Sequence, residues 1–153
     1  MSVEARLQEL GITIPEAPKP VAAYVPFVRS GDLIFTSGQI AVEGGQLKYK
    51  GKVGRDLTPE EGYQAARLCA INTLAVLKSA VGSLDKVAQI VKVVVFVNSA
   101  DGFTGQPAVA NGASELYQQV FGEAGLHARS AVGASELPMG TAVEVEVIAR
   151  ISE

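Results

Sequence analysis

The chain has 153 residues, of which 48% are hydrophobic, and a formal net charge of −3. This length is enough for one domain with its own core, and the scattered basic residues argue against a nucleic-acid-binding surface. No apolar run reaches the roughly 18 residues that a membrane-spanning helix needs. The acidic residues near the N-terminus do not fit a secretory signal. We therefore expect a cytoplasmic protein that binds neither a membrane nor nucleic acid.

The inventory of reactive side chains is small. Cys69 is the single cysteine, so an intrachain disulfide is excluded and a reducing compartment is favoured. One histidine and one cysteine are too few for a typical zinc site. The sequence also has no Gly-rich phosphate loop and no GxSxG motif. We expect neither a metal nor a cofactor.

The first part of the chain predicts a short helix followed by a hairpin. Residues 3–10 have a helical pattern that ends at Gly11, and the Pro-rich stretch after it cannot continue a helix. Residues 24–28 and 33–37 read as two strands joined by the turn "RSGD". The polar stretch "VEGGQLKYKGKVG" that follows predicts a loop or a loose second hairpin.

The clearest helix begins at Thr58. Pro59 stands at the first helical position, Glu61 completes a capping box with Thr58, and Gly82 is a natural C-cap. Later residues predict a strand over 90–97 and a second helix in "ANGASELYQQVFGEAG". Two further strands are expected around 128–134 and 142–151.

This order of elements indicates an α+β fold with two helices on one face of a sheet. In the last strand Val143, Val145 and Val147 alternate with Glu144 and Glu146, so the valines are expected to face the helices. The opposite face must then meet water or another subunit, and the high hydrophobic content favours a subunit. We expect residues 1–20 to form an N-terminal extension and residues 21–153 a single domain.

Several motifs occur in an order that resembles one family, the reactive-intermediate deaminases, also called Rid or YjgF-like proteins. The motifs are Tyr24, "SGQ" at 37–39, Asn72, "VVFVN", "HARS" at 127–130, "LP" at 137–138 and "VEVEVIA" at 143–149. The resemblance implies a chorismate-mutase-like mixed sheet and a homotrimer with a central barrel and three clefts between subunits. It implies hydrolysis of reactive enamines and imines, such as 2-aminoacrylate, to a 2-keto acid and ammonia without a cofactor.

The resemblance implies that Arg129 and Glu144 are the catalytic residues. A guanidinium group binds a carboxylate through two parallel hydrogen bonds, so Arg129 could orient an imino acid. A carboxylate in a partly apolar cleft can take a proton from water and return one to the leaving nitrogen, which suits Glu144. The alternative for Arg129 is a cross-strand salt bridge to Glu144 or Glu146. For Glu144 the alternatives are this salt bridge and a solvent-exposed position on the strand.

The resemblance also implies that Tyr24, Gly38, Ala131 and Asn111 bind the substrate. Gly38 and Ala131 would act through their backbones, and Tyr24 would close the cleft; a strand-end bulge at Gly38 and simple packing of Tyr24 are the alternatives. Many family members have cysteine where this chain has Ala131, so a thiol nucleophile there is excluded. Residues 106–112 are extra compared with the family, which leaves open whether Asn111 is the family's asparagine.

Three single residues have structural interpretations. Cys69 is expected to pack in the core, His127 to be an ordinary loop histidine, and Asn72 to bond a backbone group.

Two other functions remain open. The same cleft could bind a small carboxylate without turnover, since an arginine clamp suits binding as well as catalysis. Older family names, endoribonuclease and translation inhibitor, suggest RNA cleavage, but this usually needs two groups that titrate near neutrality, and the chain has one histidine.

Overall fold

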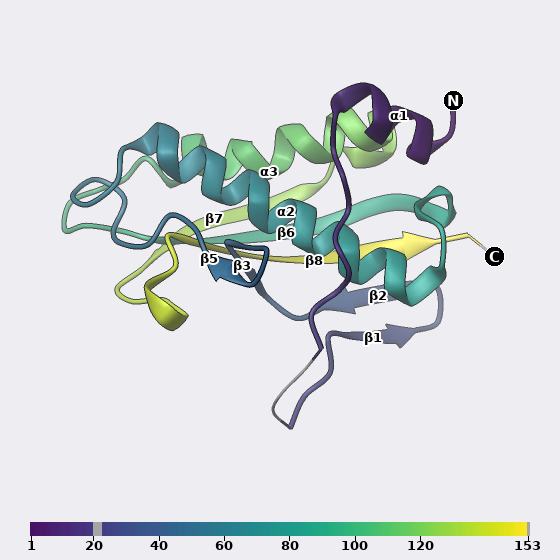
Figure 1. The fold of residues 1–153 in the computed structure, drawn as a ribbon, viewed down its shortest axis with the longest axis horizontal. Helices are drawn as coiled ribbons and strands as arrows, with labels where there is room; N and C mark the ends of the chain where they lie inside the picture. The colour runs from purple at the N-terminus through teal and green to yellow at the C-terminus, as the bar shows by residue number, and fades with distance from the viewer. Residues whose placement is uncertain (20–22, 153) are drawn as a thin grey trace.

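The computed structural model describes residues 1–19 and 23–152, which form a layer of helices on one side of a β-sheet (Figure 1). The expected boundary between the N-terminal extension and the domain falls at residues 20–22, outside the described residues. Within the described part, no helix is long and apolar enough to cross a membrane.

The main sheet is mixed, as the family resemblance implied. Its strand order is β1-β2-β8-β6-β7, and β3 also pairs with β8. β6 and β7 run parallel, whereas the other neighbours run antiparallel. The strands are β1 (Phe27–Ser30), β2 (Leu33–Thr36), β3 (Gln39–Ile40), β6 (Val87–Asn98), β7 (Ala128–Ala134) and β8 (Val143–Ile151). A separate hairpin joins β4 (Val42–Glu43) to β5 (Gln46–Leu47).

Helices α2 (Pro59–Val81) and α3 (Gln106–Phe121) pack side by side over one face of this sheet (Figure 1). The predicted capping box is present, because Thr58 Oγ1 accepts from the Glu61 amide and the Glu61 carboxylate accepts from the Thr58 amide. The predicted α+β class with two helices on one face is therefore confirmed. Three short 3₁₀ turns complete the fold: η1 (Leu84–Lys86), η2 (Gly122–Gly125) and η3 (Pro138–Gly140).

The N-terminal helix α1 (Val3–Leu10) is packed onto the helix layer. Leu7 is buried in the main hydrophobic core, and the Val3 amide donates to the Asp85 carboxylate over 2.7 Å. Arg6 donates to the Gln119 carbonyl at the end of α3. These contacts join the predicted extension to the same core as the sheet and the long helices.

Three local expectations were wrong in their bounds or left open. The first strand begins at Phe27 and not at residue 24, because Pro26 has no N–H to offer to a ladder. The second long helix begins at Gln106, earlier than its motif indicated, because Pro107 is tolerated in a first turn. The first part of the Gly-rich stretch, residues 42–47, is a tight hairpin, in which Gly44 and Gly45 both have positive φ, as a two-residue turn of the primed type requires.

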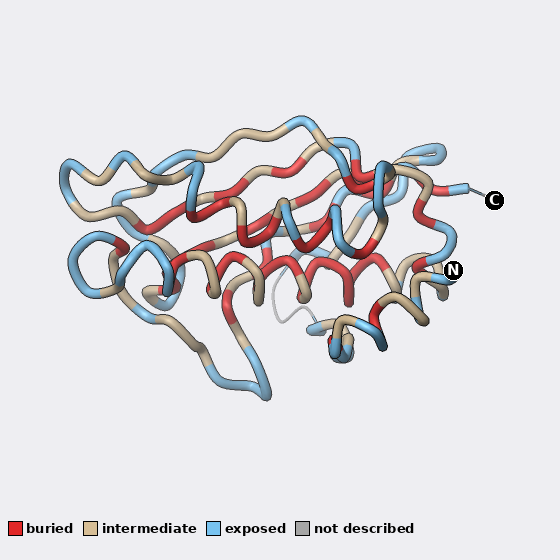
Figure 2. Tube along the Cα trace, turned by 90° about the horizontal axis from the view of Figure 1, so that it is seen from above, coloured by how far each residue is buried: buried red, intermediate tan, exposed pale blue. Residues whose placement is uncertain are grey.

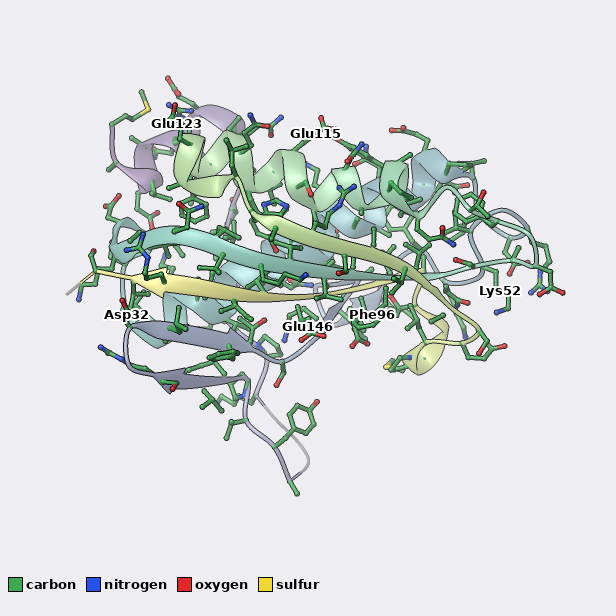
Figure 3. The ribbon with its side chains drawn as sticks, turned by 180° about the vertical axis from the view of Figure 1, so that it is seen from behind. Asp32, Lys52, Phe96, Glu115, Glu123 and Glu146 are labelled. Carbon is green, nitrogen blue, oxygen red and sulfur yellow. The ribbon has the colours of Figure 1, made fainter. Side chains whose placement is uncertain are left out.

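The alternation in the last strand is confirmed. Val143, Val145 and Val147 are buried beneath the helices, whereas Glu144 and Glu146 are partly exposed on the other face. Figure 2 shows buried residues concentrated between the helices and the sheet. Figure 3 views the molecule from behind and labels Phe96 and Glu146, which lie close together on the side away from the helices.

The face of the sheet away from α2 and α3 carries exposed apolar side chains, and no described element covers it. Phe35 pairs with Val28 and Ile148 in the ladders, so these three side chains share a face. Val28 is 54% exposed and Phe35 40%. On the other edge strand Val132, in register with Phe96, is 43% exposed.

Candidate functional site

Arg129 lies on β7, the edge strand of the sheet, and points to the helix side. Its register partner Val93 pairs in turn with Val147, and both valines are buried under the helices. Residues in register across neighbouring strands point to the same face, so Arg129 faces the helix layer as well. Ala131, two residues further along β7, shares this face and packs against the core.

Helix α3 holds one nitrogen of the Arg129 guanidinium. Nη1 donates to Asn111 Oδ1 over 2.8 Å and to Ser114 Oγ over 3.1 Å. Both hydrogens of Nη1 are therefore used. Among the described residues none accepts a hydrogen bond from Nε or Nη2, so the N–H groups on this edge of the guanidinium have no protein acceptor there. An edge with two parallel N–H donors is the fork that matches a carboxylate.

The position of α3 follows from small residues between the two long helices. A side chain at Gly112 would place its Cβ 2.0 Å from the Tyr63 carbonyl oxygen, so only glycine allows α2 and α3 to approach this closely. Asn111 and Ser114 are three residues apart and therefore lie on the same side of α3. Residues 106–112 thus form the first turns of α3, and this placement brings Asn111 to Arg129.

Ser114 and His127 were missed as site residues by the sequence analysis. Ser114 Oγ lies 2.9 Å from His127 Nε2, and His127 Nδ1 lies 2.7 Å from the Gly125 carbonyl oxygen. The ring of His127 also packs edge-on against Tyr117, with ring centroids 5.8 Å apart. The sequence held one signal for Ser114: it lies three residues after Asn111 and therefore on the same side of α3. This signal could not be used, because only the fold shows that this side faces β7.

Glu144 lies on the opposite face of the sheet from Arg129. It pairs with Phe96 on β6 and with Ile40 on β3, and it is partly buried. Burial, with a smaller contribution from the negative charge of Glu146, raises the pKa of the Glu144 carboxyl above its ordinary value. A raised pKa brings a carboxyl group closer to the range in which it can exchange protons with a substrate.

No salt bridge joins Arg129 to Glu144 or Glu146, so that structural alternative is wrong. The two faces are separated by the sheet, and β6 lies between β7 and β8. Arg129 and Glu144 of one chain therefore project from opposite faces of the sheet.

Gly38 lies directly against Glu144. A Cβ at this position would stand 2.2 Å from Glu144 Oε2 and 2.8 Å from Glu144 Cδ. Glycine therefore lets the carboxylate lie over the backbone of the "SGQ" segment.

Tyr24 borders a cavity that also includes Gly38. The cavity has a volume of about 830 Å³ and lies between the Pro-rich arm, α2 and the β4–β5 hairpin. Ser37 fixes the segment next to Tyr24, because its Oγ donates to the Val25 carbonyl over 2.6 Å and its amide donates to the Pro26 carbonyl. The Tyr24 side chain is 60% exposed, so it is free to contact a ligand and is not packed in the core.

The interpretations of Cys69 and Asn72 are confirmed. Cys69 is fully buried, and burial raises the pKa of its thiol. Asn72 Nδ2 donates to the carbonyl oxygens of Ile40 and Val42, which ties α2 to the strands that follow "SGQ". Within the described ranges 1–19 and 23–152, no group of three or more His, Cys, Asp or Glu side chains is arranged to hold a metal ion.

Replacing Gly38 with alanine should displace Glu144 and lower activity more than stability. The new methyl group would meet the end of a flexible side chain that can move aside, so we expect a cost near the lower end of the about 1–3 kcal/mol typical of overpacking. We expect kcat/KM to fall about tenfold or more, because a small misplacement of a reacting group is costly. Thermal unfolding and turnover of Gly38→Ala should be measured together.

The matched control is Gly105→Ala, whose methyl group would meet Phe103 Cζ at 2.9 Å in the turn before α3. This variant should show a similar change in stability with turnover kept. Equal losses of activity in the two variants would contradict a specific role for the contact between Gly38 and Glu144.

The chain is similar to known proteins in sequence and in fold. Residues 4–151 match a family model described as "YjgF/chorismate mutase-like, putative endoribonuclease". The chain is 46% identical to Protein TCP17 of Trypanosoma cruzi, over 98% of this chain and 94% of that protein. It is 31% identical to the 2-iminobutanoate/2-iminopropanoate deaminase of Dermatophagoides farinae, over 90% and 92% of the two chains. The crystal structure of Atu1372 from Agrobacterium tumefaciens superposes with a TM-score of 0.92 at 45% identity, covering 98% of this chain and 92% of that one.

Proposed function

Because the chain belongs to the YjgF/chorismate mutase-like family, we propose that it hydrolyses reactive 2-imino acids and their enamine tautomers to 2-keto acids and ammonia. The observation that carries this proposal is the guanidinium of Arg129, which α3 holds through Nη1 while the Nε and Nη2 edge is left for a carboxylate. The name of the deaminase relative from Dermatophagoides farinae supports the same substrate class.

Arg129 would fix the substrate by its carboxylate. In a 2-imino acid the carboxylate is bonded directly to the imine carbon, so two hydrogen bonds to one arginine fix the position of the reacting atom. Holding the reacting atom in place supplies a large part of the rate enhancement when the substrate is already reactive. Tyr24, Gly38, Ala131 and Asn111 would complete the binding site around it.

Glu144 would move the protons. It takes a proton from water as the oxygen attacks the imine carbon, and it returns a proton to the nitrogen of the tetrahedral adduct. The C–N bond then breaks as the hydroxyl proton of the adduct passes to Glu144, the carbonyl forms, and ammonia leaves and takes up that proton, so one water is consumed for each 2-keto acid released. An enamine substrate first gains a proton from water at its terminal carbon to become the protonated imine, which water then attacks in the same way. No step requires a cofactor.

The site is proposed to form between copies of the chain in a homotrimer. Arg129 and Glu144 lie on opposite faces of one sheet, so a composite cleft is the way to bring them to one substrate. The exposed apolar side chains Val28, Phe35 and Val132 support burial of the uncovered face against a second copy. A cytoplasmic location, where such imines arise from lyase reactions, is part of the same proposal.

A coupled assay tests the function. A pyridoxal-phosphate lyase generates 2-aminoacrylate, and the release of keto acid and ammonia is followed with and without the wild-type protein. We expect the protein to accelerate both. Equal rates with native and heat-denatured protein would overturn the deaminase proposal.

Two other functions predict different results. A binding protein would be thermally stabilised by pyruvate and show no turnover. A ribonuclease would cleave RNA, but its single histidine is held by Ser114 and Gly125 on the helix side of the sheet. RNA cleavage that persists in Arg129→Ala and fades with further purification would indicate a contaminating nuclease.

A further inference from the structure

The contacts of His127 determine which of its nitrogens carries a proton. Nδ1 lies 2.7 Å from the Gly125 carbonyl oxygen, which can only accept, so Nδ1 must donate. In the neutral ring Nε2 is then an acceptor, and its neighbour at 2.9 Å is the hydroxyl group of Ser114. The Ser114 proton is therefore directed to His127, and the lone pairs of the Ser114 oxygen remain for Arg129 Nη1 at 3.1 Å.

We propose that His127 and Ser114 form a positioning pair that orients Arg129, with the neutral imidazole fixing the direction of the serine hydroxyl and the serine oxygen fixing Nη1. This inference rests on the proposed function, because it explains which edge of the Arg129 guanidinium binds the carboxylate of the substrate. Arg129 then directs Nε and Nη2 toward the substrate, because Ser114 and Asn111 accept both hydrogen bonds of Nη1 on the other side of the guanidinium.

The surroundings of His127 favour the neutral ring. Burial lowers the pKa of His127 below its ordinary value; the hydrogen bond to the Gly125 carbonyl opposes this shift, and the positive charge of Arg129 adds a smaller lowering. Ser114, the Tyr117 ring and the Gly125 carbonyl also contact the ring, and none of them is charged at neutral pH. The turn η2, which ends at Gly125, packs closely against α3: a Cβ at Gly125 would stand 2.1 Å from the Tyr117 carbonyl oxygen, so only glycine fits there.

The tautomer is the first test. His127 is the only histidine in the chain, so its ring nitrogens can be assigned in an NMR spectrum of the wild-type protein without ambiguity. We expect the Nδ1–H tautomer at neutral pH. A ring protonated at Nε2 would overturn the proposal, whatever the outcome of any activity assay.

The second test follows the Arg129 side chain itself, through its Nε–H resonance, which is assigned by its disappearance in Arg129→Lys. We expect this group to be rigid in wild type and mobile in His127→Ala. In His127→Gln the amide oxygen can still accept from Ser114, so rigidity should return. A rigid Arg129 in His127→Ala would overturn the proposal, and the Gln variant keeps the test valid if the Ala variant folds poorly.

The third test uses pyruvate as the carboxylate probe and measures its Kd. His127→Ala and Ser114→Ala should each weaken binding about five- to tenfold, the effect of one hydrogen bond. Since His127 acts through Ser114, the double variant should bind no more weakly than Ser114→Ala alone. Additive losses would overturn the proposal. Absence of turnover in wild type, with the tautomer and the rigidity as expected, would reject the deaminase function and leave the positioning pair standing.

Discussion

Replacing Arg129 with alanine should lower kcat/KM for 2-aminoacrylate by about 10²- to 10⁴-fold, because two hydrogen bonds to a charged group are lost. Arg129→Lys should lose nearly as much. A lysine offers a point charge and not a planar fork, and it cannot reproduce the contacts that Nη1 makes with Asn111 and Ser114. The coupled deaminase assay measures both variants.

The control for this prediction is Arg55→Ala. Arg55 is exposed and pairs with Asp56, so its loss removes one positive charge without touching β7 or α3. This variant should keep wild-type turnover. Full activity of Arg129→Ala, together with a wild-type sedimentation profile, would show that Arg129 has no role in the reaction.

Replacing Glu144 with glutamine should lower kcat by about 10²- to 10⁴-fold, the range typical of a lost general acid–base group. The same change should raise the stability of the fold near neutral pH. Because burial and Glu146 raise the pKa of Glu144, folding favours its protonated form, and the ionised form costs stability once the pH rises through the folded pKa. Glutamine removes this cost.

The pH dependence of thermal unfolding checks the sign of this effect. The gain in Tm of Glu144→Gln over wild type should be present at neutral pH and shrink as the pH falls below the folded pKa of Glu144. A loss of stability at neutral pH would show that a favourable partner holds the carboxylate in its ionised form. That result would contradict a raised pKa for Glu144.

Glu146→Gln is the matched control, since it removes a carboxylate from the same face of β8. It should keep substantial turnover. Because the charge of Glu146 contributes to the raised pKa of Glu144, this variant should move the acid limb of the kcat/KM profile to lower pH. A profile that does not move would argue that Glu144 is not the group that titrates in the reaction.

Arg129→Ala and Glu144→Gln should restore activity to each other when chains of both variants assemble in one oligomer. If each site takes Arg129 from one copy and Glu144 from the next, a chain with Glu144→Gln beside one with Arg129→Ala forms an intact site. Random mixing of equal amounts, by unfolding and refolding together, should recover about a quarter of the wild-type activity in a closed ring. No recovery would show that the two residues do not meet between copies.

Periodic patterns and short-range spacing could be interpreted without the structure. The capping box at Thr58, the C-cap at Gly82 and the alternation in β8 depend on residues within a few positions of each other, so sequence alone determined these elements. The ordered motifs also indicated the family, and they pointed to Arg129, Glu144, Gly38 and Asn111 before any fold was available.

Only the tertiary structure decided what these residues face. A strand that slips by one residue turns every side chain to the other side, so the face of Arg129 depends on the register of β7 against β6. The contacts of Asn111, Ser114 and His127 depend on how closely α3 packs on α2 at Gly112. Such contacts join segments far apart in the chain, and no local pattern encodes them, which is why the sequence could suggest the clamp but not the side chains that hold it.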